Sequence, residues 1–125
     1  MAVYQLQNLQ GQSALTSYFE AFRVNFSSDA TEALVHMPDD YLSIRVLIVV
    51  ETPWSGGSAT ISIGTAASNG LLVSAASLAA ATALSYNAVV HFDADTVVNA
   101  YLSHDSSTSG VASIYIEVLE TSKYF

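Results

Sequence analysis

Residues 43–64 read SIRVLIVVETPWSGGSATISIG, and this stretch decides the fold class. In both of its halves every second residue is apolar, and a period of two places such residues on one face of a β-strand. These residues are Ile44, Val46, Ile48 and Val50 in the first half and Ala59, Ile61 and Ile63 in the second. Pro53 lacks a backbone donor and the Gly-Gly pair after it permits a turn. The stretch therefore predicts a β-hairpin with arms 43–51 and 58–64.

The rest of the chain repeats this pattern of short alternating segments between turn-forming residues. Such segments predict further strands at 20–26, 31–37, 86–92, 96–103 and 111–120. Between the last two, residues 104–110 predict a hairpin loop. Residues 65–83 are rich in Ala and Ser and lack an amphipathic stripe, so they predict a long loop with one short helical turn near 70–74.

Seven or eight short antiparallel strands with at most one short helical turn predict an all-β fold, a jelly-roll-like antiparallel β-sandwich. At 125 residues the chain has the length of one domain. Residues 1–13 are polar and predict an extended N-terminal arm, and residues 14–125 predict the β-sandwich domain.

Composition excludes several classes of partner and site. Three Lys and Arg against eleven Asp and Glu give a net charge of -8, which argues against binding to nucleic acid or to anionic membranes. The chain has no cysteine, so disulfides and thiolate metal sites are excluded. It shows no signal peptide and no apolar run long enough to span a membrane. Because 51% of residues are hydrophobic and only 11% are charged, we expect much of the surface to contact other subunits. A compact, heavily buried β monomer is the alternative.

Catalytic chemistry is not indicated by any pattern in the chain. The serines include no Gly-x-Ser-x-Gly motif, and His36, His91 and His104 each lie in or beside a predicted strand. Glu117 and Glu120 point to opposite faces of one strand, so they do not form the carboxylate pair of a glycosidase. We therefore predict no enzymatic activity, no catalytic residues and no cofactor.

One segment has the residue types of a weak metal site. His91, Asp93 and Asp95 place an imidazole and two carboxylates on one side of an extended chain. The simpler interpretation is that both aspartates are turn residues that bond to the local backbone. We therefore predict no bound metal here.

Aromatic residues offer a possible carbohydrate site. Trp54 lies in a predicted turn and Tyr86, Tyr101 and Tyr115 lie on predicted strands, where exposed rings could stack on sugars. The alternative, which we prefer, is that Trp54 packs over the end of the sandwich or against a neighbouring subunit.

The stretch 46–118, which begins with a strand and the Pro and Gly-Gly turn, carries a resemblance to a known family in three segments. They are 58–67 (SATISIGTAA), 69–72 (NGLL) and 95–118, in which DTVVNAYL leads through a Ser/Thr/Gly loop to GVASIYIEV. Their order resembles the small jelly-roll head decoration or cement proteins of tailed bacteriophages and related fibre-base domains. The resemblance covers a little over half of the chain and implies no catalytic residues. It implies dimers or trimers on a capsid surface.

Together these features predict a non-enzymatic virion protein that stabilises the phage head by binding capsid subunits. We expect a homo-oligomer, with a trimer favoured, on the outer surface of the capsid after synthesis in the host cytoplasm. The expected partner is the major capsid protein or another virion protein, bound through Tyr4, Gln5 and Leu6 of the arm and through Trp54. The alternative is a glycan-binding or host-binding module of a tail or head fibre.

Overall fold

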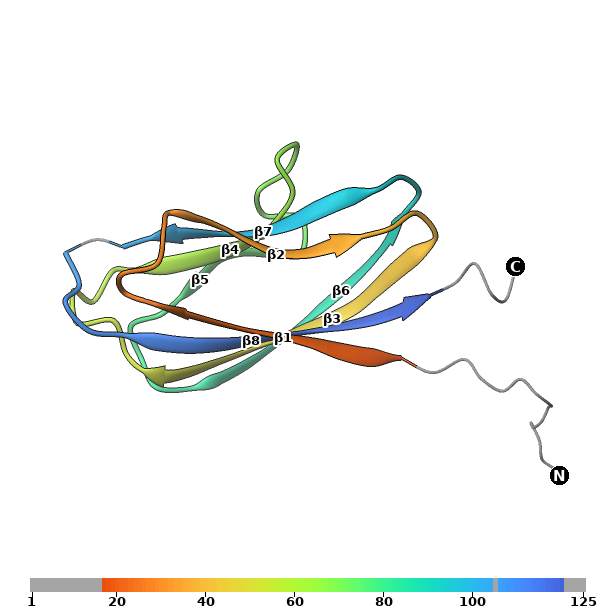
Figure 1. Ribbon diagram of the computed structural model, residues 1–125. Coiled ribbons are helices and arrows are strands. Elements are labelled where there is room, and N and C mark those ends of the chain that lie inside the picture. The colour runs from red at the N-terminus through yellow and green to blue at the C-terminus, as the bar shows by residue number, and fades with distance from the viewer. Residues whose placement is uncertain (1–16, 105, 121–125) are drawn as a thin grey trace, which may run out of the picture.

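Eight strands make up the part of the protein that the structure, a computed structural model, describes: residues 17–104 and 106–120 (Figure 1). The strands are β1 (Tyr18–Asn25), β2 (Thr31–Met37), β3 (Tyr41–Thr52), β4 (Thr60–Gly64), β5 (Val73–Ser77), β6 (Ala83–Phe92), β7 (Thr96–Ser103) and β8 (Val111–Glu120). Within these ranges there is no helix, and hence none of a length and hydrophobicity that would cross a membrane. The prediction of an all-β fold is confirmed.

The strands form two antiparallel sheets that face each other. Sheet A has the order β1-β8-β3-β6 and sheet B the order β2-β7-β4-β5. Each connection along the chain crosses from one sheet to the other, except the one between β4 and β5, which pair in sheet B (Figure 1). This connectivity is that of an eight-stranded jelly roll. The predicted antiparallel β-sandwich is therefore confirmed.

The predicted hairpin at 43–64 is wrong in its pairing. β3 lies in sheet A between β8 and β6, whereas β4 lies in sheet B between β7 and β5. The turn around Pro53 therefore carries the chain from one sheet to the other. Two strands that face each other across a core show the same alternation of buried and exposed residues as two strands that pair side by side. The alternation therefore does not distinguish the two arrangements. For the same reason residues 104–110 are not a hairpin loop, because they connect β7 of sheet B to β8 of sheet A.

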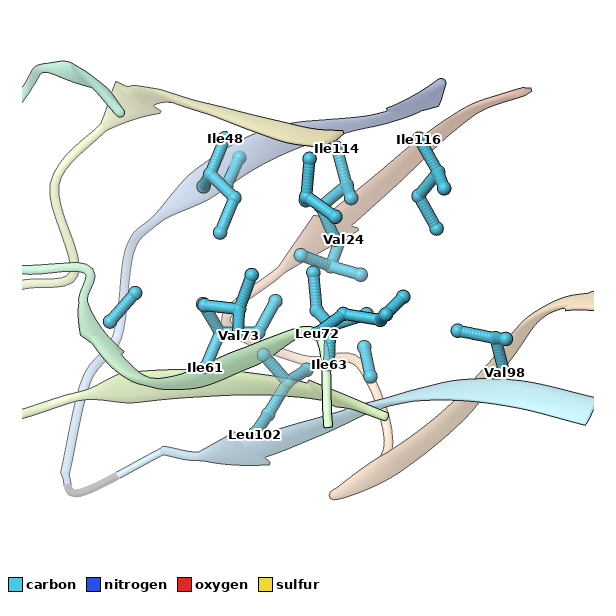
Figure 2. Packing of buried hydrophobic residues seen from close by; sticks show 14 of the residues in the cluster. Val24, Ile48, Ile61, Ile63, Leu72, Val73, Val98, Leu102, Ile114 and Ile116 are labelled. Atoms are coloured by element: carbon cyan, nitrogen blue, oxygen red, sulfur yellow. The ribbon is translucent and has the colours of Figure 1, made fainter. Parts of the chain in front are cut away.

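The core lies between the inner faces of the two sheets (Figure 2). Ile48 and Ile114 of sheet A point toward Ile61 and Ile63 of sheet B, and all four are fully buried. Full burial of one such side chain contributes about 1.5–3 kcal/mol relative to exposure. The alternation in β4 and β8 that the sequence predicts is confirmed, since Ala59, Ile61, Ile63, Ala112, Ile114, Ile116 and Val118 are all buried.

A β-bulge in β3 changes which residues face the core. The register shifts between Ser43 and Arg45 against both neighbouring strands. Ser43 is consequently buried, and its hydroxyl donates a hydrogen bond of 2.6 Å to the carbonyl oxygen of Ala88. Ile44, expected on the buried face with Val46, is only half-buried. A bulge inserts one extra residue, which reverses the alternation on one side of it.

The segment 65–83 is not a long loop with a helical turn. Its middle forms β5, which pairs with β4 at the edge of sheet B. Leu72 and Leu78 flank this strand and are both buried. These apolar anchors hold the segment extended against the core, which outweighs the helix propensity of its alanines.

Candidate functional site

The three residues considered for a metal site lie at the end of β6 and in the turn that follows it. β6 ends at Phe92, directly after His91, and Asp93 and Asp95 lie in the exposed turn to β7. In the described ranges no three His, Asp or Glu side chains gather in a way that could hold a metal ion. The structure thus does not bring His91, Asp93 and Asp95 together as ligands.

His91 and Asp95 instead face the end of β2 and the turn between β2 and β3. His91 Nε2 lies 3.5 Å from Asp40 Oδ1, and Asp95 Oδ2 lies 3.9 Å from His36 Nε2. The other carboxylate oxygen of Asp95 accepts a 3.1 Å hydrogen bond from the backbone amide of Asp39. These side chains are about half exposed, where ion pairs contribute little to stability. They join two turns at one end of the sandwich.

Trp54 is buried and is not part of the surface that a partner would contact. Its side chain is 1% exposed and its ring lies against the backbone of Gly110. The backbone amide of Trp54 donates to the carbonyl oxygen of Leu78 at 2.8 Å. The contact with a partner that the sequence suggested for Trp54 needs an exposed ring. The structure gives the residue the other role considered, packing over the end of the sandwich.

Tyr4, Gln5 and Leu6 lie outside the described residues. The described chain begins at Ser17, whose hydroxyl donates a 2.6 Å hydrogen bond to Glu117 Oε2. It then enters β1, which is an edge strand of sheet A. The arm expected at 1–13 therefore precedes a sheet edge.

The tyrosines considered for a sugar site, Tyr86, Tyr101 and Tyr115, do not gather into one aromatic platform. Tyr86 packs against the core from the inner face of sheet A. Tyr101 lies on the outer face of sheet B, since Ala100 and Leu102 beside it are buried. Tyr115 lies on the outer face of sheet A, since Ile114 and Ile116 are buried. Those two outer faces are on opposite sides of the sandwich, and Trp54 is inside it, so these rings do not form the sugar-binding groove considered from the sequence.

The outer face of sheet A carries both arginines of the described chain, each beside a glutamate. Arg45 Nε donates to Glu117 Oε1 at 3.1 Å, and its guanidinium lies 5.8 Å from the centroid of the Phe19 ring. The sequence alone does not predict this cluster. Its signal is weak, because Arg45 and Glu117 stand 72 residues apart and become neighbours only through the pairing of β3 with β8.

A second charged group lies on the same face near the other end of the strands. Arg23 of β1 forms an ion pair with Glu51 of β3. The hydroxyl of Ser113 in β8, between them, donates to Glu51 Oε2 at 2.8 Å. Each arginine on this face is thus neutralised by a carboxylate.

Among the residues that the structure describes, Tyr18 is the one whose ionisation is clearly perturbed. Partial burial, which leaves 44% of the residue exposed, raises the pKa of Tyr18 to about 12, with smaller contributions from the hydroxyl of Tyr41 and the carboxylates of Glu20 and Glu120. Both effects disfavour the negative tyrosinate. Tyr18 therefore stays neutral far above physiological pH and acts as a hydrogen-bonding, partly apolar side chain at the acidic end of β1.

Comparisons with known proteins find similarity to this chain among solved structures. No family model and no curated protein matches the sequence. A chain of the acidic stable capsid structure of Helicobacter pylori bacteriophage KHP30 is similar, with a TM-score of 0.70, 14% identity and coverage of 82% of this chain and 86% of that one. A chain of the cyanophage Pam1 capsid asymmetric unit is similar with a TM-score of 0.65 and 13% identity, over 94% of this chain and 97% of that one. At these identities the likeness establishes a shared fold.

Proposed function

We propose that this protein is a non-enzymatic structural component of a bacteriophage virion. The observation that carries the proposal is the jelly-roll fold, which the chain shares over most of its length with chains of two phage capsid structures. The acidic, charge-poor composition and the paired charges on the outer face of sheet A agree with a protein that works against other protein subunits.

Within the virion we propose the role of a decoration or cement protein on the outer capsid surface, made in the host cytoplasm and bound to the major capsid protein. A protein that binds only the assembled shell stabilises that shell by its own binding free energy. Several copies joined in an oligomer would strengthen the attachment through avidity. The trimer favoured from the sequence stays a prediction.

The N-terminal arm is the proposed point of attachment. An extended segment can add a strand to an exposed sheet edge of a partner, with main-chain hydrogen bonds providing the affinity. Tyr4, Gln5 and Leu6 are the residues we assign to this contact. In support, the described chain begins directly before β1, which is an edge strand of sheet A.

The test is co-sedimentation of the full chain with shells of the parent virus prepared without it. We expect the chain to sediment with the shells and to raise the temperature at which they rupture. Leu6→Pro removes a backbone donor from the arm and should weaken binding at least tenfold. Gln12→Pro, at the end of the arm near the domain, is the matched control and should bind like the unchanged chain. Full-length protein that stays in the supernatant would refute the proposed attachment.

A further inference from the structure

The outer face of sheet A presents apolar side chains in its centre. The pairing of the strands places Tyr115 of β8 between Ala21 of β1 and Leu47 of β3. Val49 lies two residues further along β3, and Val89 stands on the neighbouring strand with 69% of its surface exposed. Among residues 17–104 and 106–120 no element packs on this face (Figure 1). An apolar sheet face of this kind marks an interaction surface.

The charges on this face cancel, in contrast to the rest of the acidic chain. Arg45 is paired with Glu117 and Arg23 with Glu51, so the face carries no net charge. The turns at one end of the sandwich carry a group of aspartates, namely Asp39, Asp40, Asp93 and Asp95. Two copies of a chain with net charge -8 repel each other least where carboxylates are neutralised. The electrostatics thus favour the outer face of sheet A for contact between copies.

The outer face of sheet B has a different character. Its outward residues include Thr60, Ser62, Asn99 and Tyr101, and Asn99 Nδ2 donates to the Tyr101 hydroxyl at 3.1 Å. Such hydroxyl and amide groups are well hydrated and cost free energy to desolvate. The apolar centre is a property of sheet A, and the two faces can be compared by matched substitutions.

We propose that a second copy of this chain docks on the outer face of sheet A, so that two sandwiches pack through their A sheets. A face that meets its own copy forms a closed two-fold contact, which gives a dimer in place of the trimer favoured from the sequence. Four strands about 4.8 Å apart and about ten residues long present roughly 600 Å² each. The dimer would bury roughly 1,200 Å², the lower limit of specific interfaces, so we expect association in the micromolar range. The inference rests on the self-association that the proposed function includes. It does not depend on binding to the shell.

The test measures the mass of the full chain by light scattering across a range of concentrations. We expect a mass of two chains at about 100 µM and of one chain at about 0.1 µM. Tyr115→Glu places a carboxylate at the centre of the face and should weaken dimerisation at least tenfold. Tyr101→Glu makes the same change on the outer face of sheet B and should leave the dimer unchanged. Because the face is neutral and apolar, the dimer should persist in 1 M NaCl.

A second pair of variants guards against misfolding at position 115. Val89→Glu, at an exposed position of the same face, should also weaken the dimer, whereas Val97→Glu on sheet B, where Val97 is 47% exposed, should not. A chain that is monomeric or trimeric at all concentrations would overturn the inference. So would equal losses from the variants on sheet A and sheet B. Shell binding by a chain that never dimerises would refute this inference while leaving the proposed function standing.

Discussion

The indole ring of Trp54 lies so close to Gly110 that a Cβ atom at position 110 would overlap it. The two residues come from different crossings of the sandwich: Trp54 from the one between β3 and β4, and Gly110 from the one between β7 and β8. Backbone hydrogen bonds hold the two crossings together, since the amide of Ser55 donates to the carbonyl oxygen of Ser109 at 3.1 Å. This contact closes one end of the jelly roll.

Gly110→Ala should therefore destabilise the protein severely. A Cβ at this position would overlap the Trp54 ring, and the φ angle of 151° is one that residues with a side chain rarely adopt. Overpacking and backbone strain each cost about 1–3 kcal/mol, so we expect a loss of about 2–6 kcal/mol in the free energy of unfolding. Urea denaturation followed by tryptophan fluorescence measures it directly.

Gly57→Ala provides the matched control. Gly57 also has a positive φ, 87°, but a Cβ there would meet no atom within 4 Å. Only the backbone strain remains, so we expect a loss of about 1–2 kcal/mol. Equal losses from the two variants would show that the ring contact at Gly110 contributes nothing.

The sequence predicts the strands of this fold well and their partners poorly. The predicted bounds of β2, β7 and β8 agree with the structure, because alternation reports directly which side of a strand is buried. It does not report which strand lies beside it, so β3 and β4 were expected to pair although they belong to opposite sheets. The bulge at Ser43 cannot be predicted, because a serine in an apolar strand gives no sign of being buried.

The contacts between charged side chains on the surface are even harder to predict from the sequence. The neighbours of His91 and Asp95 come from β2 and the turn after it, far away in the sequence, so their spacing of four residues suggests a site that the fold does not assemble. The pairing of Arg45 with Glu117 follows from strand order, which depends on how the whole chain closes. Local pattern therefore determines the elements, and long-range topology determines the surfaces.

Ser43→Ala should weaken the fold although it removes only one atom. The buried hydroxyl donates to the carbonyl oxygen of Ala88, and without it this bond inside the sandwich is lost. We expect a loss of about 1–2 kcal/mol in the free energy of unfolding. Ser85→Ala, at an exposed position of β6, is the control and should change the stability by less than about 0.5 kcal/mol. If both variants are equally stable, the hydrogen bond from the Ser43 hydroxyl does not contribute to the stability of the fold.

The two arginines on sheet A should differ in their contribution to stability. Glu117 is only 16% exposed, so Arg45→Met leaves a largely buried carboxylate without its main partner. We expect a loss of about 1–2 kcal/mol, between the values for exposed and buried pairs. Arg23→Met breaks a more exposed pair with Glu51 and should cost about 0.5 kcal/mol or less. Thermal melts in low and high salt compare them, and an Arg23 variant that is the less stable of the two would contradict this ranking.

Tyr18 should make the protein sensitive to alkaline pH. Its pKa is raised to about 12 by burial, by the hydroxyl of Tyr41 and by nearby carboxylates, whereas in the unfolded chain it is 10.0. The unfolded state thus loses its proton first. The stabilisation is fully present below pH 10 and is lost as the pH rises through 12.

Tyr18→Phe cannot ionise and should lose less stability than the unchanged chain when urea midpoints are compared from about pH 9 to about pH 12. Glu120→Gln should give an intermediate result, because it removes one of the charges that raise the pKa. An identical alkaline loss in the Tyr18→Phe variant would show that Tyr18 is not responsible.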